Sequence, residues 1–165
     1  MLYSYNPNAL TITWNGVDLS HGWAENTFLE IEPLEARKTT TFGADGQMCV
    51  SVSANHGAKI SLTLQQTSTA NQDIALVNTA ESALSLASDS LAISAFTVSG
   101  DSHLGSFIAW NAVLTEQPTN TFANTVGEKT WVWVCETMIE TDDTASILAS
   151  ASNFINSETS LLNSL

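Results

Sequence analysis

Short segments that alternate apolar and polar residues constrain this fold more than any other feature of the chain. In residues 9–15, Leu10, Ile12 and Trp14 alternate with threonine, and residues 59–66 repeat the pattern. A period of two places alternate side chains on opposite faces, as in a strand with one buried face. Residues 28–32 alternate in the same way, and Glu30 and Glu32 therefore share one face. The pattern predicts a mainly β fold.

Glycine-containing turns separate these segments. Asn15-Gly16 follows the first strand and predicts a hairpin with residues 17–23. Residues 35–41 and 47–53 flank Phe42-Gly43-Ala44-Asp45-Gly46, which predicts a long hairpin with Asp45-Gly46 near its tip. The three threonines before this turn favour an extended arm because their branched side chains suit strands.

Two parts of the chain show helical spacing instead. Ile74, Val77, Leu84 and Ala87 predict one helix at about 71–86. Strand patterns return at 91–99, 106–114 and 129–139, and the last, with Trp-Val-Trp-Val-Cys, is apolar on both faces. Residues 144–165 carry an apolar stripe that predicts a C-terminal amphipathic helix.

Together these elements predict a rolled β-sandwich or barrel with one flanking helix and a C-terminal helix. The length of 165 residues suits one β-domain, which we expect at 1–143, with 144–165 as an extension.

The charge balance argues against nucleic-acid binding. The chain has 17 acidic and 4 basic residues, for a net charge of −13. Proteins that grip nucleic acids need clustered lysine and arginine to neutralise phosphates. The first residues lack the basic and apolar regions of a signal peptide, and no run reaches the ~20 apolar residues of a membrane helix. We expect synthesis in a cytoplasm and no membrane insertion.

Neither catalytic nor metal-binding chemistry is indicated. The three histidines lie far apart, and Cys49 and Cys135 are expected to be core thiols, with a disulfide as the alternative. Gly100-Asp101-Ser102-His103 resembles an esterase block, but its central position and the lack of a later Asp-x-x-His favour a turn. We expect no enzyme activity, metal or cofactor.

Four segments carry a resemblance to a known family. Tyr5-Asn6-Pro7 with Ala-Leu-Thr-Ile-Thr-Trp-Asn-Gly-Val, the Gly-Ala-Asp-Gly turn, and Leu-Thr-Leu-Gln-Gln-Thr-Ser about twenty residues later resemble the tail tube proteins of contractile-tailed phages. The final Trp-Val-Trp-Val-Cys-Glu strand is similar to the closing strand of that family. The resemblance covers roughly residues 5–140, and 144–165 are longer than the usual end.

The resemblance implies a virion structural subunit. It implies six copies per ring and rings that stack into the inner tube of a contractile tail. Strands of all copies would line the conduit for genome ejection. The implied partners are the sheath protein, a baseplate initiator and the tape measure protein, and DNA would pass without specific binding.

We predict two functional surfaces from this reading. Glu30 and Glu32 are candidates for the lumen, although the same alternation also allows a solvent-facing position. The arm is the candidate contact between subunits, and it comprises Arg37, Lys38, Thr39, Thr40, Thr41, Phe42, Gly43, Ala44, Asp45 and Gly46.

Two other functions fit the same features. The inner tube of a type VI secretion system or another contractile injection system has the same expected fold. A carbohydrate-binding β-sandwich is suggested by the five tryptophans, since aromatic faces stack on sugars. However, Trp14, Trp131 and Trp133 lie in alternating strands, which favours a core position.

Overall fold

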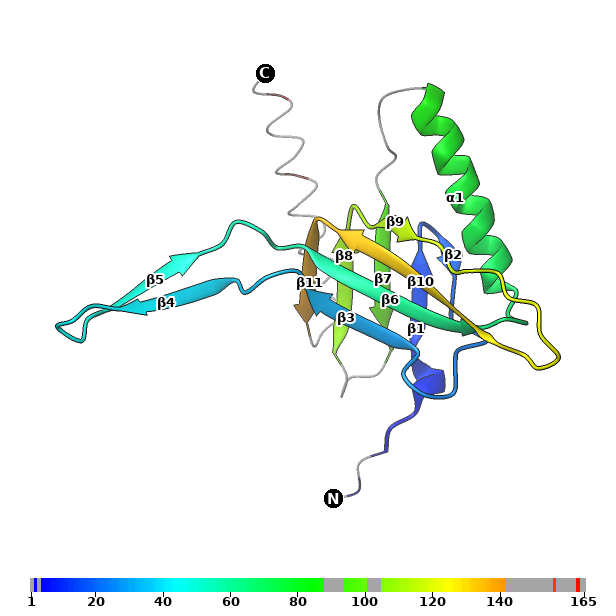
Figure 1. Ribbon diagram of the computed structural model, residues 1–165, viewed down its shortest axis with the longest axis horizontal. Helices are drawn as coiled ribbons and strands as arrows, with labels where there is room; N and C mark the ends of the chain where they lie inside the picture. The colour runs from blue at the N-terminus through cyan, green and yellow to red at the C-terminus, as the bar shows by residue number, and fades with distance from the viewer. Residues whose placement is uncertain are drawn as a thin grey trace.

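Two β-sheets, a protruding hairpin and one α-helix make up most of the described part of the chain (Figure 1). The computed structural model describes residues 2, 4–87, 94–100 and 105–141, together with Asn156 and Asn163. A short 3-10 helix, Pro7–Ala9, precedes the first strand. The predicted C-terminal helix and domain extension at 144–165 lie outside the described residues, except for those two asparagines.

The first sheet has five strands in the order β11-β8-β7-β1-β2. These strands are β1 (Thr11–Trp14), β2 (Val17–Asp18), β7 (Ala95–Ser99), β8 (Ser106–Trp110) and β11 (Thr137–Thr141). The Asn15-Gly16 turn joins β1 to β2 as predicted, and both of its residues have positive φ. Strand β2 is shorter than the predicted 17–23, and the carboxylate of its last residue, Asp18, accepts a hydrogen bond from the Ser20 N–H.

The second sheet has four strands in the order β3-β6-β10-β9, each antiparallel to its neighbour. These strands are β3 (Leu29–Pro33), β6 (Ala58–Gln65), β9 (Val113–Glu116) and β10 (Glu128–Cys135). The predicted alternation in β6 is confirmed, because Ile60, Leu62 and Leu64 are fully buried.

The predicted arm is a two-stranded ribbon that projects away from both sheets (Figure 1). It consists of β4 (Lys38–Phe42) and β5 (Met48–Val52). Every residue of both strands is exposed. The arm therefore adds nothing to the core of its own chain.

Helix α1 (Ala70–Ala87) matches the predicted helix at 71–86 and follows β6 directly. Ile74 anchors its first half because this side chain is fully buried in the core. A second anchor is the buried amide of Asn71, whose Oδ1 accepts a hydrogen bond from Trp131 Nε1 at 2.9 Å. The amide of Asn71 also donates to the carbonyl of Gln65.

Aromatic rings fill the space between the two sheets. Trp14 and Trp133 are fully buried and meet edge to face, with ring centroids 5.5 Å apart. Phe96 packs against Trp133 with a centroid separation of 5.1 Å. The predicted core positions of Trp14, Trp131 and Trp133 are confirmed, and these rings are not available to stack on a sugar.

Two predicted strands are each divided between the sheets. Residues 106–114 form β8 and β9, and residues 129–139 form β10 and β11. The breaks fall at Asn111, which has a φ of 53°, and at Glu136. The prediction of two continuous strands was therefore wrong, because a break of one or two residues takes each segment from one sheet to the other.

The fold class is confirmed as mainly β, with two packed antiparallel sheets and one flanking helix. The sequence predicted either a sandwich or a barrel. The described residues form a sandwich and close no barrel. In the part of the chain that the structure describes, no helix is long and apolar enough to span a membrane.

Candidate assembly surfaces

The root of the arm is fastened to the five-stranded sheet. Arg37 Nη2 donates a hydrogen bond to the carbonyl of Met138 in β11 at 3.1 Å, and the Arg37 carbonyl accepts from the N–H of Ser53. The Ser53 hydroxyl also bonds to the carboxylate of Glu35. These contacts hold both strands where they leave the body, so the direction of the arm is set by the sandwich.

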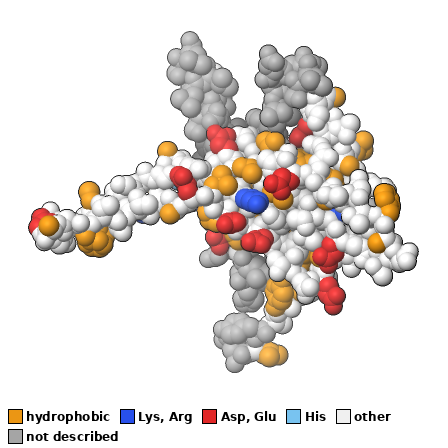
Figure 2. Space-filling model, viewed as in Figure 1, with side chains coloured by type: hydrophobic (Ala, Val, Ile, Leu, Met, Phe, Trp, Pro, Cys, Tyr) orange, Lys and Arg blue, Asp and Glu red, His pale blue; other side chains and the backbone are white. Residues whose placement is uncertain are grey.

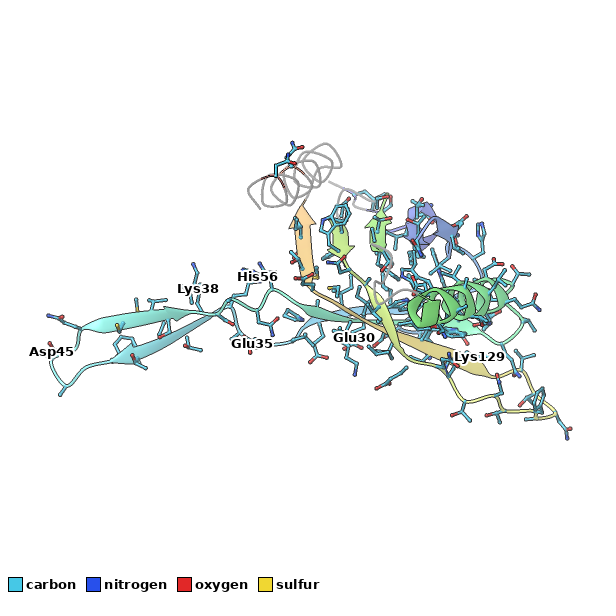
Figure 3. All side chains as sticks on the ribbon, turned by 90° about the horizontal axis from the view of Figure 1, so that it is seen from above. Glu30, Glu35, Lys38, Asp45, His56 and Lys129 are labelled. Atoms are coloured by element: carbon cyan, nitrogen blue, oxygen red, sulfur yellow. The ribbon has the colours of Figure 1, made fainter. Side chains whose placement is uncertain are left out.

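The tip of the arm is a compact turn. The N–H of Gly43 donates to the carbonyl of Gln47 at 2.8 Å, and the carboxylate of Asp45 accepts from the N–H of Gln47. Gly46 has a φ of 80°, a conformation that only glycine adopts without strain. The predicted position of Asp45-Gly46 at the tip is confirmed, and Figure 3 shows Asp45 at the end of the ribbon.

Glu30 and Glu32 lie on the outer face of the four-stranded sheet, opposite the core. Both side chains are exposed, and their register partners Ser61 and Lys59 share that face. Figure 3 shows Glu30 pointing away from the five-stranded sheet, and Figure 2 shows acidic side chains gathered over this face. Glu116 and Glu128, at the ends of β9 and β10, are also exposed. The face is therefore acidic, with Lys59 as a basic residue within it.

The free edge of β3 is only partly able to pair. The Phe28 carbonyl accepts a hydrogen bond from the N–H of Thr63 in β6, and the Leu34 N–H donates to the carbonyl of Gly57, just before β6. In an antiparallel ladder the intervening residues Leu29, Ile31 and Pro33 turn their backbone groups to the other side. Proline has no N–H, so Pro33 ends the run of donors on this edge.

Cys49 corrects one prediction about the cysteines. Cys135 is buried in the core, but Cys49 lies exposed on β5, and both thiols are free. A strand-like sequence indicated burial for both, yet β5 belongs to a ribbon with no core beneath it. Burial raises the pKa of the Cys135 thiol, although its backbone hydrogen bonds act in the opposite direction.

The hollow beside the start of α1 is lined by polar groups that are already engaged within the chain. It has a volume of about 420 Å³ and lies between the first turn of α1 and the end of β9, where Asn71, Lys129 and Trp131 line it. The polar groups of all three residues already make hydrogen bonds within the chain. Among the described residues no three His, Cys, Asp or Glu side chains come together as a metal site. The residues 101–103 of the esterase-like block lie outside the described part.

The sequence did not indicate the loop at 117–127 as a functional surface. This loop joins β9 to β10 and exposes 92% of Phe122 and 67% of Val126. The signal in the sequence is a long, mainly polar segment with two large apolar residues, Phe122 and Val126, a composition that predicts only a surface loop.

The fold resembles solved structures of contractile injection systems. The tube-terminating cap of the anti-feeding prophage superposes with a TM-score of 0.52 at 11% identity, covering 85% of this chain and 92% of that one. The sheath/tube terminator of the extracellular contractile injection system PVC gives 0.53 at 10% identity, covering 84% and 97%. A chain of the PVC sheath-tube complex in the extended state gives 0.52 at 10%, covering 84% and 91%. At these identities the likeness shows a shared fold, that of tube and cap subunits.

The sequence, unlike the fold alone, places the chain in a particular family. The family model of the bacteriophage PhiTE tail tube protein matches residues 1–141, and the chain belongs to this family. None of the curated protein sequences matches it. The chain is therefore a structural, tail-tube-type component of a virion tail, which confirms the resemblance found in the sequence.

Proposed function

We propose that this protein is the inner-tube subunit of a contractile phage tail. Six copies form a ring, rings stack into a tube within the sheath, and the lumen conducts the genome during ejection. The sheath protein, a baseplate initiator and the tape measure protein are its partners. The observation that carries this proposal is the four-stranded sheet, which has an acidic outer face and, among the described residues, no partner strand at either edge.

Free strand edges promote pairing between chains unless they are covered or closed. The edge strands β3 and β9 run antiparallel to each other because the sheet has four alternating strands. In a ring, β9 of one copy meets β3 of the next copy with the antiparallel arrangement preserved. Repetition around the axis then closes a continuous barrel and removes every free edge of this sheet.

The outer face of this sheet would line the lumen. Six copies at −13 each carry −78 in all, and Glu30 and Glu32 would contribute directly to the wall. An acidic wall repels phosphates, so DNA slides without being held. The arm, formed by β4 and β5, projects away from both sheets and would contact the adjacent ring.

Cryo-electron microscopy of the assembled protein, alone or with a baseplate initiator, tests the proposal. We expect hollow tubes with Glu30 and Glu32 facing the channel. Tubes with both carboxylates on the outer wall would contradict the lumen assignment. A protein that stays monomeric in every condition would contradict the whole proposal.

A second candidate is a tube-terminating role. It is favoured by the resemblance to the anti-feeding prophage cap and the PVC terminator. A terminator forms a single ring that does not grow, whereas a tube subunit forms stacks whose length depends on protein concentration. Tube length measured over a range of concentrations separates the two functions.

A further inference from the structure

Exposed apolar side chains gather at two opposite ends of the molecule. On the arm, 70% of Phe42, 58% of Met48 and 69% of Val52 are exposed. The 117–127 loop exposes 92% of Phe122 and 67% of Val126. In Figure 3, Asp45 at the arm tip and Lys129 beside the loop mark the two ends of the long axis. One chain therefore carries two apolar surfaces that cannot meet each other.

The apolar residues of the arm share one face. Phe42 pairs with Met48, Thr40 with Val50 and Lys38 with Val52, so these side chains lie on the same side of the ribbon. The other side carries Thr39, Thr41, Cys49 and Ser51. An isolated two-stranded ribbon is marginally stable in water. An apolar face on such a ribbon is therefore expected to be covered by another surface.

The 117–127 loop is held in a defined position by Gln66. The side-chain amide of Gln66 donates to the carbonyl of Thr121 at 2.8 Å, and its oxygen accepts from the N–H of Gly127 at 3.2 Å. The backbone of Gln66 donates to the Gly127 carbonyl as well. Lys129 Nζ donates to Asn120 Oδ1 at 2.9 Å. The loop therefore presents Phe122 from a fixed base.

Both surfaces stand at the ends of the same strands. The arm connects β3 to the start of β6, and the loop leads into β10 beside the end of β6. A second copy displaced along the strand direction brings its arm to the loop of the first. Such a head-to-tail contact uses two different patches and does not close, so it generates a filament.

Charge also favours a second copy as the occupant. Lys38 stands on the apolar face of the arm and is one of only 4 basic residues in the chain. The loop is followed by the exposed carboxylate of Glu128 and then by Lys129, whose ammonium is already bonded to Asn120 of the same loop. Lys38 on the arm and Glu128 beside the loop carry opposite charges. Contact between the two surfaces therefore offsets part of the repulsion between two acidic chains.

We infer that Phe122 and Val126 on the 117–127 loop form the receiving surface for the apolar face of the arm of a copy in the adjacent ring. This inference rests on the proposed tube function and specifies its stacking contact. The arm contributes Phe42, Met48, Val50 and Val52, and the loop contributes the aromatic side chain that they cover.

The first test compares Phe122→Ser with Leu76→Ser. Leu76 is an exposed apolar residue on α1, with 71% exposure, and it serves as the matched control. We expect both variants to fold like the wild type, as checked by thermal unfolding. Phe122→Ser should raise the concentration needed for tube growth about tenfold or more, because the buried apolar contact of the phenylalanine ring is lost. Leu76→Ser should assemble normally.

The outcomes of this test separate the inference from the proposed function. Tubes that form equally well from Phe122→Ser overturn the receiving surface but leave the tube function intact. A wild-type protein that forms no tubes, alone or with a baseplate initiator, overturns the tube function itself.

A cross-linking test examines the contact directly. Both partners carry Cys49→Ser, which removes the exposed thiol. A Met48→Cys variant is mixed with a Phe122→Cys variant under mild oxidation at assembly concentration. We expect a disulfide-linked heterodimer on a non-reducing gel, and a much weaker one when Leu76→Cys replaces Phe122→Cys. Equal yields from both mixtures would overturn the inference.

Discussion

The side chain of Asn111 donates a hydrogen bond from Nδ2 to the carboxylate of Glu136 at 2.5 Å, at the corner where two chain segments pass from one sheet to the other. The N–H of Glu136 also donates to the carbonyl of Trp110. Asn111 has a φ of 53°, and asparagine tolerates this left-handed conformation better than most residues. The corner holds the two sheets in the relation that encloses the tryptophan core.

Substitution of Asn111 should weaken the fold through this corner. Asn111→Ala loses the hydrogen bond and adds left-handed strain, so we expect a loss of about 2 kcal/mol in the free energy of unfolding. Asn111→Gly also loses the hydrogen bond but accepts the positive φ. It should therefore lose less than Asn111→Ala in urea titrations. An equal loss of unfolding free energy in both variants would mean that the left-handed backbone at residue 111 causes no strain in Asn111→Ala.

The two cysteines should differ in reactivity. Cys49 is exposed on the arm, whereas Cys135 is buried with a raised pKa, and thiolates rather than thiols react with alkylating reagents. We expect Cys49 to react rapidly in the native protein and Cys135 to react only after denaturation. Mass spectrometry after timed alkylation measures this. Rapid native labelling of a Cys49→Ser variant would contradict the burial of Cys135.

The raised pKa of Cys135 also predicts a pH effect on stability. Burial favours the neutral thiol, so the folded chain holds this proton more tightly than the unfolded chain. The resulting stability is present below the ordinary thiol pKa of 9.0 and is lost as the pH rises toward the higher folded value. Urea titrations between pH 8 and 10 should show this decline, and it should be smaller in Cys135→Ala.

Assembly should depend on salt because the chains repel one another. The screening length falls from ~30 Å at 0.01 M salt to ~8 Å at 0.15 M, so we expect tubes to grow more readily at the higher salt concentration. Glu30→Gln/Glu32→Gln should reduce this requirement. The control Glu25→Gln/Asp73→Asn removes the same charge from other exposed positions. Equal effects of both double variants, measured by light scattering, would contradict the lumen position.

Gln66 should control the order of the 117–127 loop. Gln66→Ala removes two side-chain hydrogen bonds to that loop, and we expect a loss of about 1–2 kcal/mol in stability. Amide hydrogen exchange at Gly127, whose N–H donates to Gln66, should be faster in Gln66→Ala than in the wild type. Exchange in core strands such as β6 should change less. Unchanged protection at Gly127 would show that Gln66 does not hold the loop.

Much of the local structure follows from nearby residues. Alternation identified the strands around Trp14 and Leu62, glycine turns identified the arm, and helical spacing identified α1. These signals are read from neighbours in the chain and do not depend on distant contacts. The exposure of Cys49 could not be obtained in this way, because the same strand pattern occurs over a core and on a free ribbon.

The sequence by itself determined the class of fold, the hairpin arm, the acidic character and the tail tube resemblance. Only the tertiary structure decided that β8 and β9 belong to different sheets, that β3 and β9 are the free edges, and that Phe122 stands at the end opposite the arm. The physical reason is that strand pairing joins residues far apart in the chain, such as Trp131 and Leu62. Alternation gives each strand two faces, but only its partners decide which face is buried and which edge stays free.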